Sequence, residues 1–221
     1  MHTIANVSTA DAQSAAGAPL RIGQYAPTFA ARSTHGEVRL SDYRGGWLLL
    51  FFHPADFTPV CTSEFVQLAA RAPDFAALGC ALLGVSADSV YAHLAWLADL
   101  KQHFATEVPF PLVEDSGLRI AGAYGLLDPA AGDTAAIRSC LVIDPAGVVR
   151  AVLWYPPQIG RNVDELLRLV GALVHSERRG LSTPAGWQPG QALLETAPAS
   201  TGQLDADGPQ DRLWYYRERH P

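Results

Sequence analysis

The sequence predicts a mixed α/β fold, in which helices cover a central sheet, followed by a smaller loop-rich unit. Three observations support this prediction. The chain has 221 residues, 48% of them hydrophobic and 17% charged, which is enough for one full domain with a sizeable core. Short apolar runs alternate with helical patterns from about residue 45 to residue 175, as in sheets covered by helices. After about residue 180, prolines and glycines interrupt every long pattern.

The predicted strands are four short apolar runs. They lie at residues 47–53, 80–86, 137–143 and 148–154. The first contains the longest apolar run of the chain, which is typical of a buried strand. The last two are joined by residues 144–147, Asp-Pro-Ala-Gly, a type I turn pattern, so we expect an antiparallel hairpin there. The sheet should therefore be mixed.

The predicted helices begin at recognisable cap residues. One is expected at about residues 89–100, another at about 117–124, and a third from Val163 to near Gly180. The third has the clearest pattern, with Asn162 as N-cap, Glu165 three residues later and one apolar stripe. A further helix is predicted to open at residues 58–59, with threonine as the cap and proline at the first helical position.

Charge and hydropathy exclude several classes of partner. The formal charge of −6 leaves no basic stripe for nucleic acid or acidic lipid. The apolar run 47–52 is too short to cross a bilayer. Residues 1–18 lack the charged start and apolar centre of a secretory signal, and we expect a disordered N-terminal tail there. The sequence therefore predicts a soluble, cytoplasmic protein with no nucleic-acid and no membrane partner.

The three cysteines are widely and unequally spaced. Cys61, Cys80 and Cys140 fit neither a disulfide framework nor a zinc or redox pair, which favours a reducing compartment. Cys80 opens a predicted core strand and should be buried. Cys140 shares a strand face with Arg138, so it could lie near a site, although a core role is favoured.

Cys61 is predicted to lie in the first turn of the helix that follows the first strand. Unpaired backbone amides and the helix dipole favour a thiolate over a thiol there. In α/β sheets, functional sites gather at the carboxyl ends of strands, and this loop follows such an end. The alternative is a small apolar residue packed under the helix start. Thr58 likewise has two compatible roles, as a helix cap and as a hydrogen-bond donor beside the thiolate.

Residues 53–64, His-Pro-Ala-Asp-Phe-Thr-Pro-Val-Cys-Thr-Ser-Glu, resemble the active-site segment of peroxiredoxins. Pro54, Thr58 and Cys61 reproduce the family pattern Pro-x-x-x-Thr-x-x-Cys, and weaker similarities extend over residues 20–190. The resemblance implies a thioredoxin-like fold.

The resemblance also implies a division of the chain into three parts. Residues 1–18 would be the tail, residues 19–176 the thioredoxin-like peroxidase domain, and residues 177–221 a C-terminal peroxiredoxin extension domain.

The C-terminal part is similar to the one-cysteine subgroup, the peroxiredoxin-six type. Typical two-cysteine members have a resolving cysteine in Cys-Pro-Ala-Gly-Trp, whereas this chain has Thr183 at that place. No cysteine follows Cys140. The resemblance thus implies a thiol-dependent peroxidase with a single peroxidatic cysteine.

The family mechanism assigns a role to each residue of the pattern. The Cys61 thiolate is implied to attack hydrogen peroxide or an organic hydroperoxide and to become a sulfenic acid. Thr58, Arg138 and the Cys61 amide would bind the peroxide oxygens, and Pro54 would shield the thiolate from water. Arg138 is the one charge in an apolar run, so it should need an anionic partner, either the thiolate or Glu64. The alternative is an edge-strand arginine that points to solvent.

His53 could tune the thiolate or only pack at the end of its strand. A zinc site with Cys61 would need two more ligands, and no such spacing is present. We therefore expect neither a metal nor another cofactor.

The implied partners are an external thiol and a second copy of the chain. Glutathione, glutaredoxin and thioredoxin all remain open as reductants. The family suggests homodimers or rings of dimers, with the aromatic residues 214–216 as an interface. Two other functions stay open: a peroxide sensor or redox-regulated holdase using the same thiolate, and a disulfide oxidoreductase, which Thr58 disfavours because it stands where a second cysteine would be needed.

Overall fold

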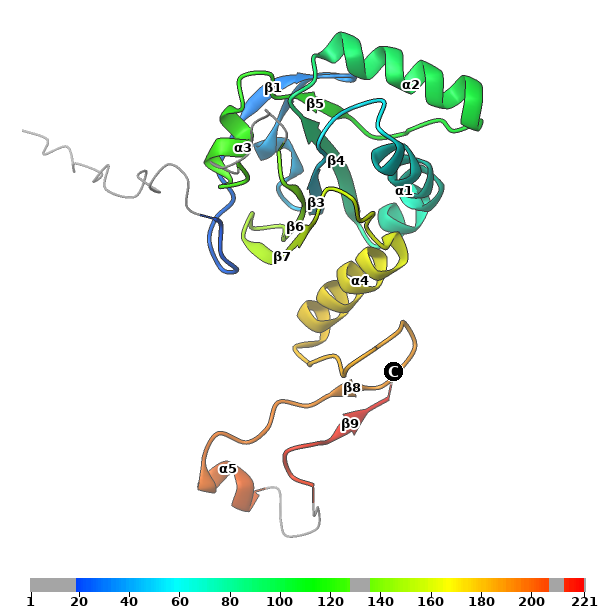
Figure 1. Cartoon of the computed structure of the whole chain (residues 1–221). Helices are drawn as coiled ribbons and strands as arrows, with labels where there is room; N and C mark the ends of the chain where they lie inside the picture. Colours follow the sequence, from blue (N-terminus) through cyan, green and yellow to red (C-terminus); the bar gives the residue numbers. More distant parts are fainter. Residues whose placement is uncertain (1–18, 128–135, 207–212, 221) are drawn as a thin grey trace, which may run out of the picture. The chain divides into compact units, whose positions relative to one another are not determined.

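The computed structural model describes residues 19–127, 136–206 and 213–220 (Figure 1). The predicted N-terminal tail, residues 1–18, lies outside them. The chain divides into two compact units, Met1–Arg161 and Asn162–Pro221. The expected domains 19–176 and 177–221 stay a prediction.

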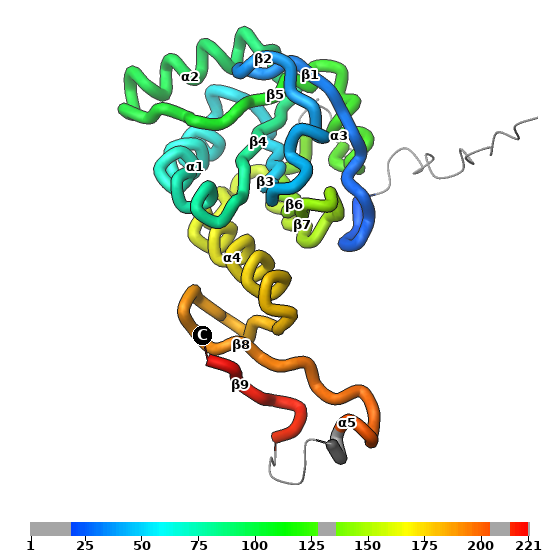
Figure 2. Tube along the Cα trace, turned by 180° about the vertical axis from the view of Figure 1, so that it is seen from behind, coloured from blue at the N-terminus to red at the C-terminus, as the bar shows by residue number. Residues whose placement is uncertain are grey.

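A seven-stranded mixed sheet forms the first unit, in the order β2-β1-β5-β4-β3-β6-β7 (Figures 1 and 2). The strands are β1 (Ala30–Ser33), β2 (Gly36–Arg39), β3 (Trp47–Phe52), β4 (Cys80–Ser86), β5 (Leu112–Glu114), β6 (Arg138–Ile143) and β7 (Val149–Tyr155). Strand β3 runs parallel to β4 and antiparallel to β6. The predicted mixed α/β fold is confirmed, and the four predicted strands differ from the observed ones by at most one residue at an end.

The hairpin between β6 and β7 forms where the turn pattern predicted it. The two strands pair antiparallel, and the Gly147 amide donates to the Asp144 carbonyl at 2.8 Å, which closes the turn. Gly147 has φ +80°, a conformation that glycine adopts without steric cost.

All six residues of strand β3 are buried. Since successive side chains point to opposite sides of the sheet, the strand is buried on both faces. The Phe51 ring contacts Phe65 of α1 (Pro59–Ala77), with centroids 5.6 Å apart. The Phe52 ring contacts Tyr124, which follows α3 (Arg119–Ala123), at 5.6 Å. Helices α1 and α3 accordingly lie on opposite sides of the sheet (Figures 1 and 2).

Two helices differ from their predicted bounds. Helix α2 (Val90–Phe104) begins one residue after the predicted start, with Ser89 as N-cap, and it continues past residue 100 until Ala105 takes a left-handed conformation with φ 50°. Helix α3 begins later than predicted because Leu118 has φ 54°. Neither residue is a glycine, so the sequence carried no signal for these turns. A short 3-10 helix, η1 (Leu40–Tyr43), precedes β3.

The second unit begins with α4 (Val163–Arg179), whose predicted caps are both observed. The Asn162 side chain accepts from the Glu165 amide at 3.0 Å, and Gly180 ends the helix with φ +63°. After α4 come β8 (Leu193–Leu194), α5 (Thr201–Ala206) and β9 (Glu218–Arg219), with β8 and β9 paired antiparallel. A small core of Ala172, Trp187 and Leu193 holds this unit together. Throughout the described ranges, no helix has both the length and the apolar character that spanning a membrane requires.

Candidate active site

Cys61 lies in the first turn of α1, at the edge of the sheet where β3 ends. Cys61 is completely buried. Thr58 occupies the N-cap position and Pro59 the first helical position, as the sequence predicted. The sulfur therefore lies near the positive end of a 19-residue helix, where negative charge is stabilised.

The Thr58 side chain does not cap the helix, which corrects one prediction. Its hydroxyl donates to the Ala55 carbonyl at 2.8 Å instead of accepting from a helix amide. The reason is local: Phe57 has φ 56°, so the chain turns sharply before the helix and brings the Ala55 carbonyl within reach of the hydroxyl. The Thr58 oxygen keeps its lone pairs for another donor.

Arg138 is buried at the start of β6, with 2% of its surface exposed, so the solvent-exposed alternative is wrong. Its Nη1 lies 3.5 Å from the Cys61 sulfur and 2.5 Å from Oε2 of Glu64. Its Nη2 donates to the Pro157 carbonyl at 2.9 Å. The Nε of Arg138 has no hydrogen-bond partner among the described residues. Both predicted anionic partners thus surround one buried guanidinium group, and one of its donors stays free.

Arg161 is a second buried arginine, to which the sequence pattern assigns no role. It donates to both oxygens of Glu64, from Nε at 2.9 Å and from Nη2 at 2.6 Å. Its Nη1 lies 3.1 Å from the carbonyls of Phe52 and Ser139 and 3.5 Å from the Cys140 sulfur. Arg161 lies in a loop just before a helix, where an arginine is usually exposed, so its type and position alone do not reveal its burial.

The buried charges of the site do not balance when Cys61 is a thiol. Arg138 and Arg161 each carry a positive charge, and Glu64 is the one carboxylate hydrogen-bonded to either of them among the described residues. A buried charge without a counter-ion is costly, so one more negative charge is favoured here. A thiolate at Cys61, next to Arg138, supplies it.

For the other two cysteines, burial disfavours a thiolate. Burial raises the pKa of Cys80 to about 12. Burial also raises the pKa of Cys140, despite the opposing effect of Arg161. Both are buried, as predicted for Cys80, and both should remain thiols at neutral pH.

The residues before Thr58 line the same loop. Pro54 is half-buried in the loop between β3 and α1. His53 is completely buried, and its Nε2 lies 2.9 Å from Oδ1 of Asp56. The ring also packs against Phe65 and Trp96, with centroids 5.0 and 5.6 Å away. The contacts of His53 are thus aromatic packing and one hydrogen bond to Asp56, in line with the predicted packing role.

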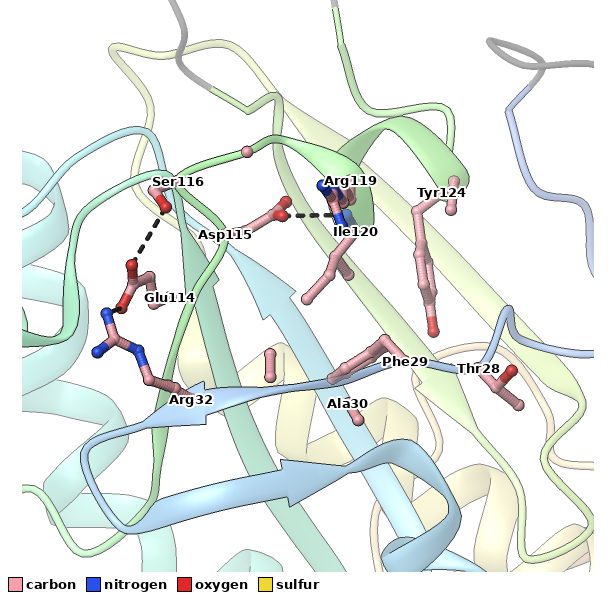
Figure 3. Close-up of a pocket in the computed structure, with 13 residues that line it drawn as sticks. Thr28, Phe29, Ala30, Arg32, Glu114, Asp115, Ser116, Arg119, Ile120 and Tyr124 are labelled. Atoms are coloured by element: carbon pink, nitrogen blue, oxygen red, sulfur yellow. Dashed lines mark hydrogen bonds and ion pairs between the residues drawn. The ribbon is translucent and has the colours of Figure 1, made fainter.

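A separate cavity of about 470 Å³ lies at the end of β5 (Figure 3). Segments 28–32 and 114–120 provide most of its lining. Its acidic groups already have partners: Glu114 binds Arg32, and the Asp115 carboxylate accepts from the Ile120 and Ala121 amides at 3.0 and 2.8 Å. None of the residues predicted for catalysis lines this cavity.

Comparisons with known proteins agree on one family. Residues 22–152 match the model of the AhpC/TSA family. The chain is 48% identical to a protein of Thermoplasma acidophilum named peroxiredoxin 2, over 89% of this chain and 98% of that protein.

Solved structures show the same likeness. A yeast mitochondrial 1-Cys peroxiredoxin, studied for thiol resolution via glutathione/thioredoxin systems, superimposes with a TM-score of 0.81 at 33% identity, covering 91% of this chain and all of that one. A cysteine-to-serine mutant of peroxiredoxin 6 from Arenicola marina gives a TM-score of 0.77 at 30% identity, covering 85% and 88%.

Proposed function

The chain belongs to the AhpC/TSA family, the peroxiredoxins, and from this membership we propose that it reduces peroxides through a single cysteine, Cys61, which an external thiol then reduces again. The enzyme class, a peroxiredoxin-type peroxidase, follows from the family. The proposed substrates are hydrogen peroxide and organic hydroperoxides. The observation that supports Cys61 most strongly is the excess of buried positive charge beside its sulfur.

In the proposed first step, the Cys61 thiolate attacks one oxygen of the O–O bond. A sulfur–oxygen bond forms and the O–O bond breaks, so the sulfur is oxidised to a sulfenic acid. The other oxygen leaves with the bonding electrons, takes up a proton and departs as water or an alcohol. The peroxide is reduced by the two electrons that the sulfur loses.

Three groups are proposed to position the peroxide. The free Nε of Arg138 and the Cys61 backbone amide donate hydrogen bonds to its oxygens and stabilise the charge on the leaving oxygen. The Thr58 oxygen accepts from the peroxide O–H, because its own hydrogen is held by Ala55. Pro54 excludes water from the sulfur. Glu64 orients both arginines and does not touch the peroxide.

The sulfenic acid is proposed to be reduced from outside the chain. Thr183 replaces the resolving cysteine of two-cysteine relatives, and Cys80 and Cys140 are buried thiols. A first external thiol would form a mixed disulfide with Cys61 and release water, and a second thiol would release the protein as a thiol. Glutathione, glutaredoxin and thioredoxin are candidates, and the similar yeast protein was studied with glutathione/thioredoxin systems.

We also propose a compartment and an oligomeric state for the enzyme. All three cysteines are free, which suits a reducing compartment such as the cytoplasm. A homodimer, or a ring of dimers, would cover the exposed aromatic side chains of residues 214–216, whose exposed fractions range from 41% to 59%. Sedimentation velocity of the full chain measures the assembly directly.

A second function uses the same thiolate. A peroxide sensor or redox-regulated holdase would be oxidised once at Cys61 and would then change its assembly. Steady-state consumption of peroxide with added thiol separates the two, because a peroxidase turns over many times and a sensor stops after one oxidation.

The test of the proposal compares three cysteine variants. Cys61→Ser should abolish thiol-dependent peroxide consumption, because serine cannot form the sulfenic acid. The matched controls Cys80→Ser and Cys140→Ser should retain most of the activity, since neither sulfur takes part. Consumption of peroxide by Cys61→Ser at the wild-type rate would overturn the proposal.

A further inference from the structure

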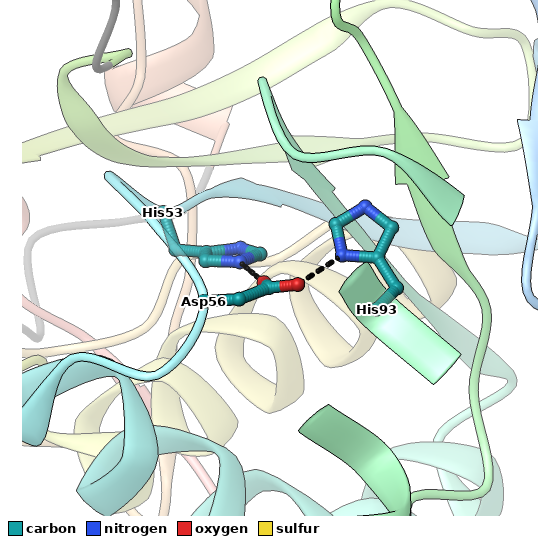
Figure 4. A group of neighbouring side chains, drawn as sticks. All are labelled: His53, Asp56 and His93. Carbon is teal, nitrogen blue, oxygen red and sulfur yellow. Dashed lines mark hydrogen bonds and ion pairs between the residues drawn. The ribbon is translucent and has the colours of Figure 1, made fainter. Parts of the chain in front are cut away.

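Three buried titratable side chains form a cluster next to the arginine network. His53 follows β3, Asp56 lies in the loop between β3 and α1, and His93 belongs to α2. The exposed fractions of their side chains are 0%, 1% and 0%. The Asp56 carboxylate lies between the two imidazole rings (Figure 4), with Oδ1 2.9 Å from His53 Nε2 and Oδ2 2.7 Å from His93 Nδ1.

The hydrogen bonds indicate which protons the cluster holds. His93 faces an acceptor on each side, because its Nε2 lies 3.3 Å from the Val113 carbonyl of β5. A neutral imidazole has one N–H, so only the doubly protonated ring can donate to both acceptors. The shorter of the two contacts, 2.7 Å from Nδ1, is the hydrogen bond to Asp56. His53 needs one N–H, toward Asp56, since its Nδ1 has no partner in the described part of the chain.

The titration behaviour of the other two groups agrees with this arrangement. Burial lowers the pKa of His53 more than its hydrogen bond to Asp56 raises it, which keeps the ring neutral. Burial opposes ionisation of Asp56, but the hydrogen bonds from both histidines outweigh it and hold the pKa of Asp56 below its usual value. The Asp56 carboxylate is therefore ionised and lies between the two rings.

The cluster joins the active-site loop to two other elements. Asp56 binds α2 through His93, and His93 binds β5 through Val113. The Asp56 backbone amide also donates to Oδ2 of Asp88 at 3.0 Å. Asp56 is thus anchored by both its side chain and its backbone.

The anchored residue stands in the middle of the loop that carries the peroxide-binding groups. Pro54 lies two positions before Asp56 and Thr58 two positions after it. Between them, Phe57 holds an unfavourable φ of 56°, which persists only where the surroundings impose it. Loss of the Asp56 side-chain contacts to His53 and His93 would remove part of the restraint that holds Phe57 in this conformation, and the Thr58 oxygen would move.

We infer that Asp56 and His93 are positioning residues for the peroxide reaction, which hold the loop from Pro54 to Thr58 against α2 and β5. They do not touch the peroxide. The inference rests on the proposed function, and it deepens it by assigning a purpose to the buried Asp56–His93 hydrogen bond.

The test measures two reactions of Cys61 in the full-length protein. One is the second-order rate constant for hydrogen peroxide, which needs a correctly placed Thr58. The other is alkylation by iodoacetamide, which needs a reactive sulfur but not the peroxide-binding groups. Asp56→Asn keeps the size of the side chain but cannot accept from both imidazoles. His93→Gln keeps an N–H donor for Asp56 but removes the ring that reaches the Val113 carbonyl. His103→Gln, an exposed histidine on the same helix, is the matched control.

In both cluster variants we expect the peroxide rate constant to fall about 10- to 100-fold, while the alkylation rate changes by less than about threefold. His103→Gln should change neither rate. The variants are measured well below their melting temperatures, and His93→Gln decides the question alone if Asp56→Asn does not fold.

Four results would overturn the inference. If the wild type reacts with peroxide and the folded Asp56 and His93 variants react at the same rate, the positioning role is refuted and the proposed function stays intact. An equal fall in both rates would mean that the cluster acts on the sulfur in general. A chelator that slows the wild type as much as the substitutions do would make the three residues a metal site instead. A wild type that does not react with peroxide would overturn the proposed function as well.

Discussion

Glu64 holds the two guanidinium groups of the site in place. Its carboxylate accepts from Arg138 at 2.5 Å and from Arg161 at 2.6 and 2.9 Å, and it also accepts from the Arg161 backbone amide at 2.7 Å. All three side chains are at most 2% exposed. A buried ion pair adds little to folding stability compared with apolar side chains of similar size. Removing one partner, however, leaves the other charge buried and unpaired.

Glu64→Gln should therefore destabilise the protein strongly. The glutamine fills the same space but leaves two buried positive charges without a carboxylate, and we expect a loss of about 3–5 kcal/mol in the free energy of unfolding. Denaturant titration measures this loss. Glu165→Gln is the control, because Glu165 pairs with Arg168 near the surface, where a loss of under about 1 kcal/mol is expected. Equal losses in the two variants would contradict the account of the buried network.

Individual residues of the site were predictable to different degrees. Cys61 could be placed at the helix start from the proline, threonine and strand pattern around it, because these are local signals. Arg138 could be recognised as a buried charge because it interrupts an apolar strand. Arg161 and the pair of Asp56 with His93 could not, since their partners lie 97 and 37 positions away in the chain. Such contacts depend on how the elements pack.

Helices α1 and α2 both begin after a residue with a hydroxyl group, but the two hydroxyls form different hydrogen bonds. In α2, the Ser89 side chain accepts from the Ala92 amide at 3.2 Å and caps the helix. In α1, the Thr58 hydroxyl turns away to Ala55. Both N-cap residues carry a hydroxyl, but the bend at Phe57 decides which partner the Thr58 hydroxyl reaches.

Removing each hydroxyl in turn should lower stability in both variants but slow the reaction with peroxide in only one of them. Ser89→Ala and Thr58→Val each lose one side-chain hydrogen bond, and we expect each to cost about 1 kcal/mol of stability. Only Thr58→Val should also slow the reaction with peroxide, by about tenfold or more, because its oxygen faces the substrate in the proposed mechanism. Thermal unfolding and stopped-flow oxidation measure the two effects. A Thr58→Val protein that reacts at the wild-type rate would remove Thr58 from the mechanism.

The elements were predicted best where local patterns decide them. Strands β3, β4, β6 and β7 and helix α4 appear within one residue of their predicted starts, since apolar runs, a turn sequence and cap residues mark them. The end of α2 and the start of α3 were missed because Ala105 and Leu118, which are not glycines, take left-handed conformations. Single-residue propensities associate this conformation with glycine, so they do not predict it at an alanine or a leucine.

For the whole molecule, cysteine number and placement decide the type of mechanism. Peroxiredoxins that carry a resolving cysteine form a disulfide after oxidation, whereas this chain has Thr183 where that cysteine would stand. Cys80 and Cys140 are buried, and burial raises the pKa of each. Oxidation should therefore stop at a sulfenic acid on Cys61 until an external thiol arrives.

Mass spectrometry of the intact protein after one equivalent of hydrogen peroxide tests this claim most directly. In the presence of a sulfenic-acid trap, we expect one trap adduct per chain, located at Cys61 by peptide mapping. Without the trap, the mass should rise by about 16 Da, one oxygen, until a thiol is added. A disulfide between Cys61 and Cys80 or Cys140, or oxidation of a different cysteine, would contradict the one-cysteine mechanism.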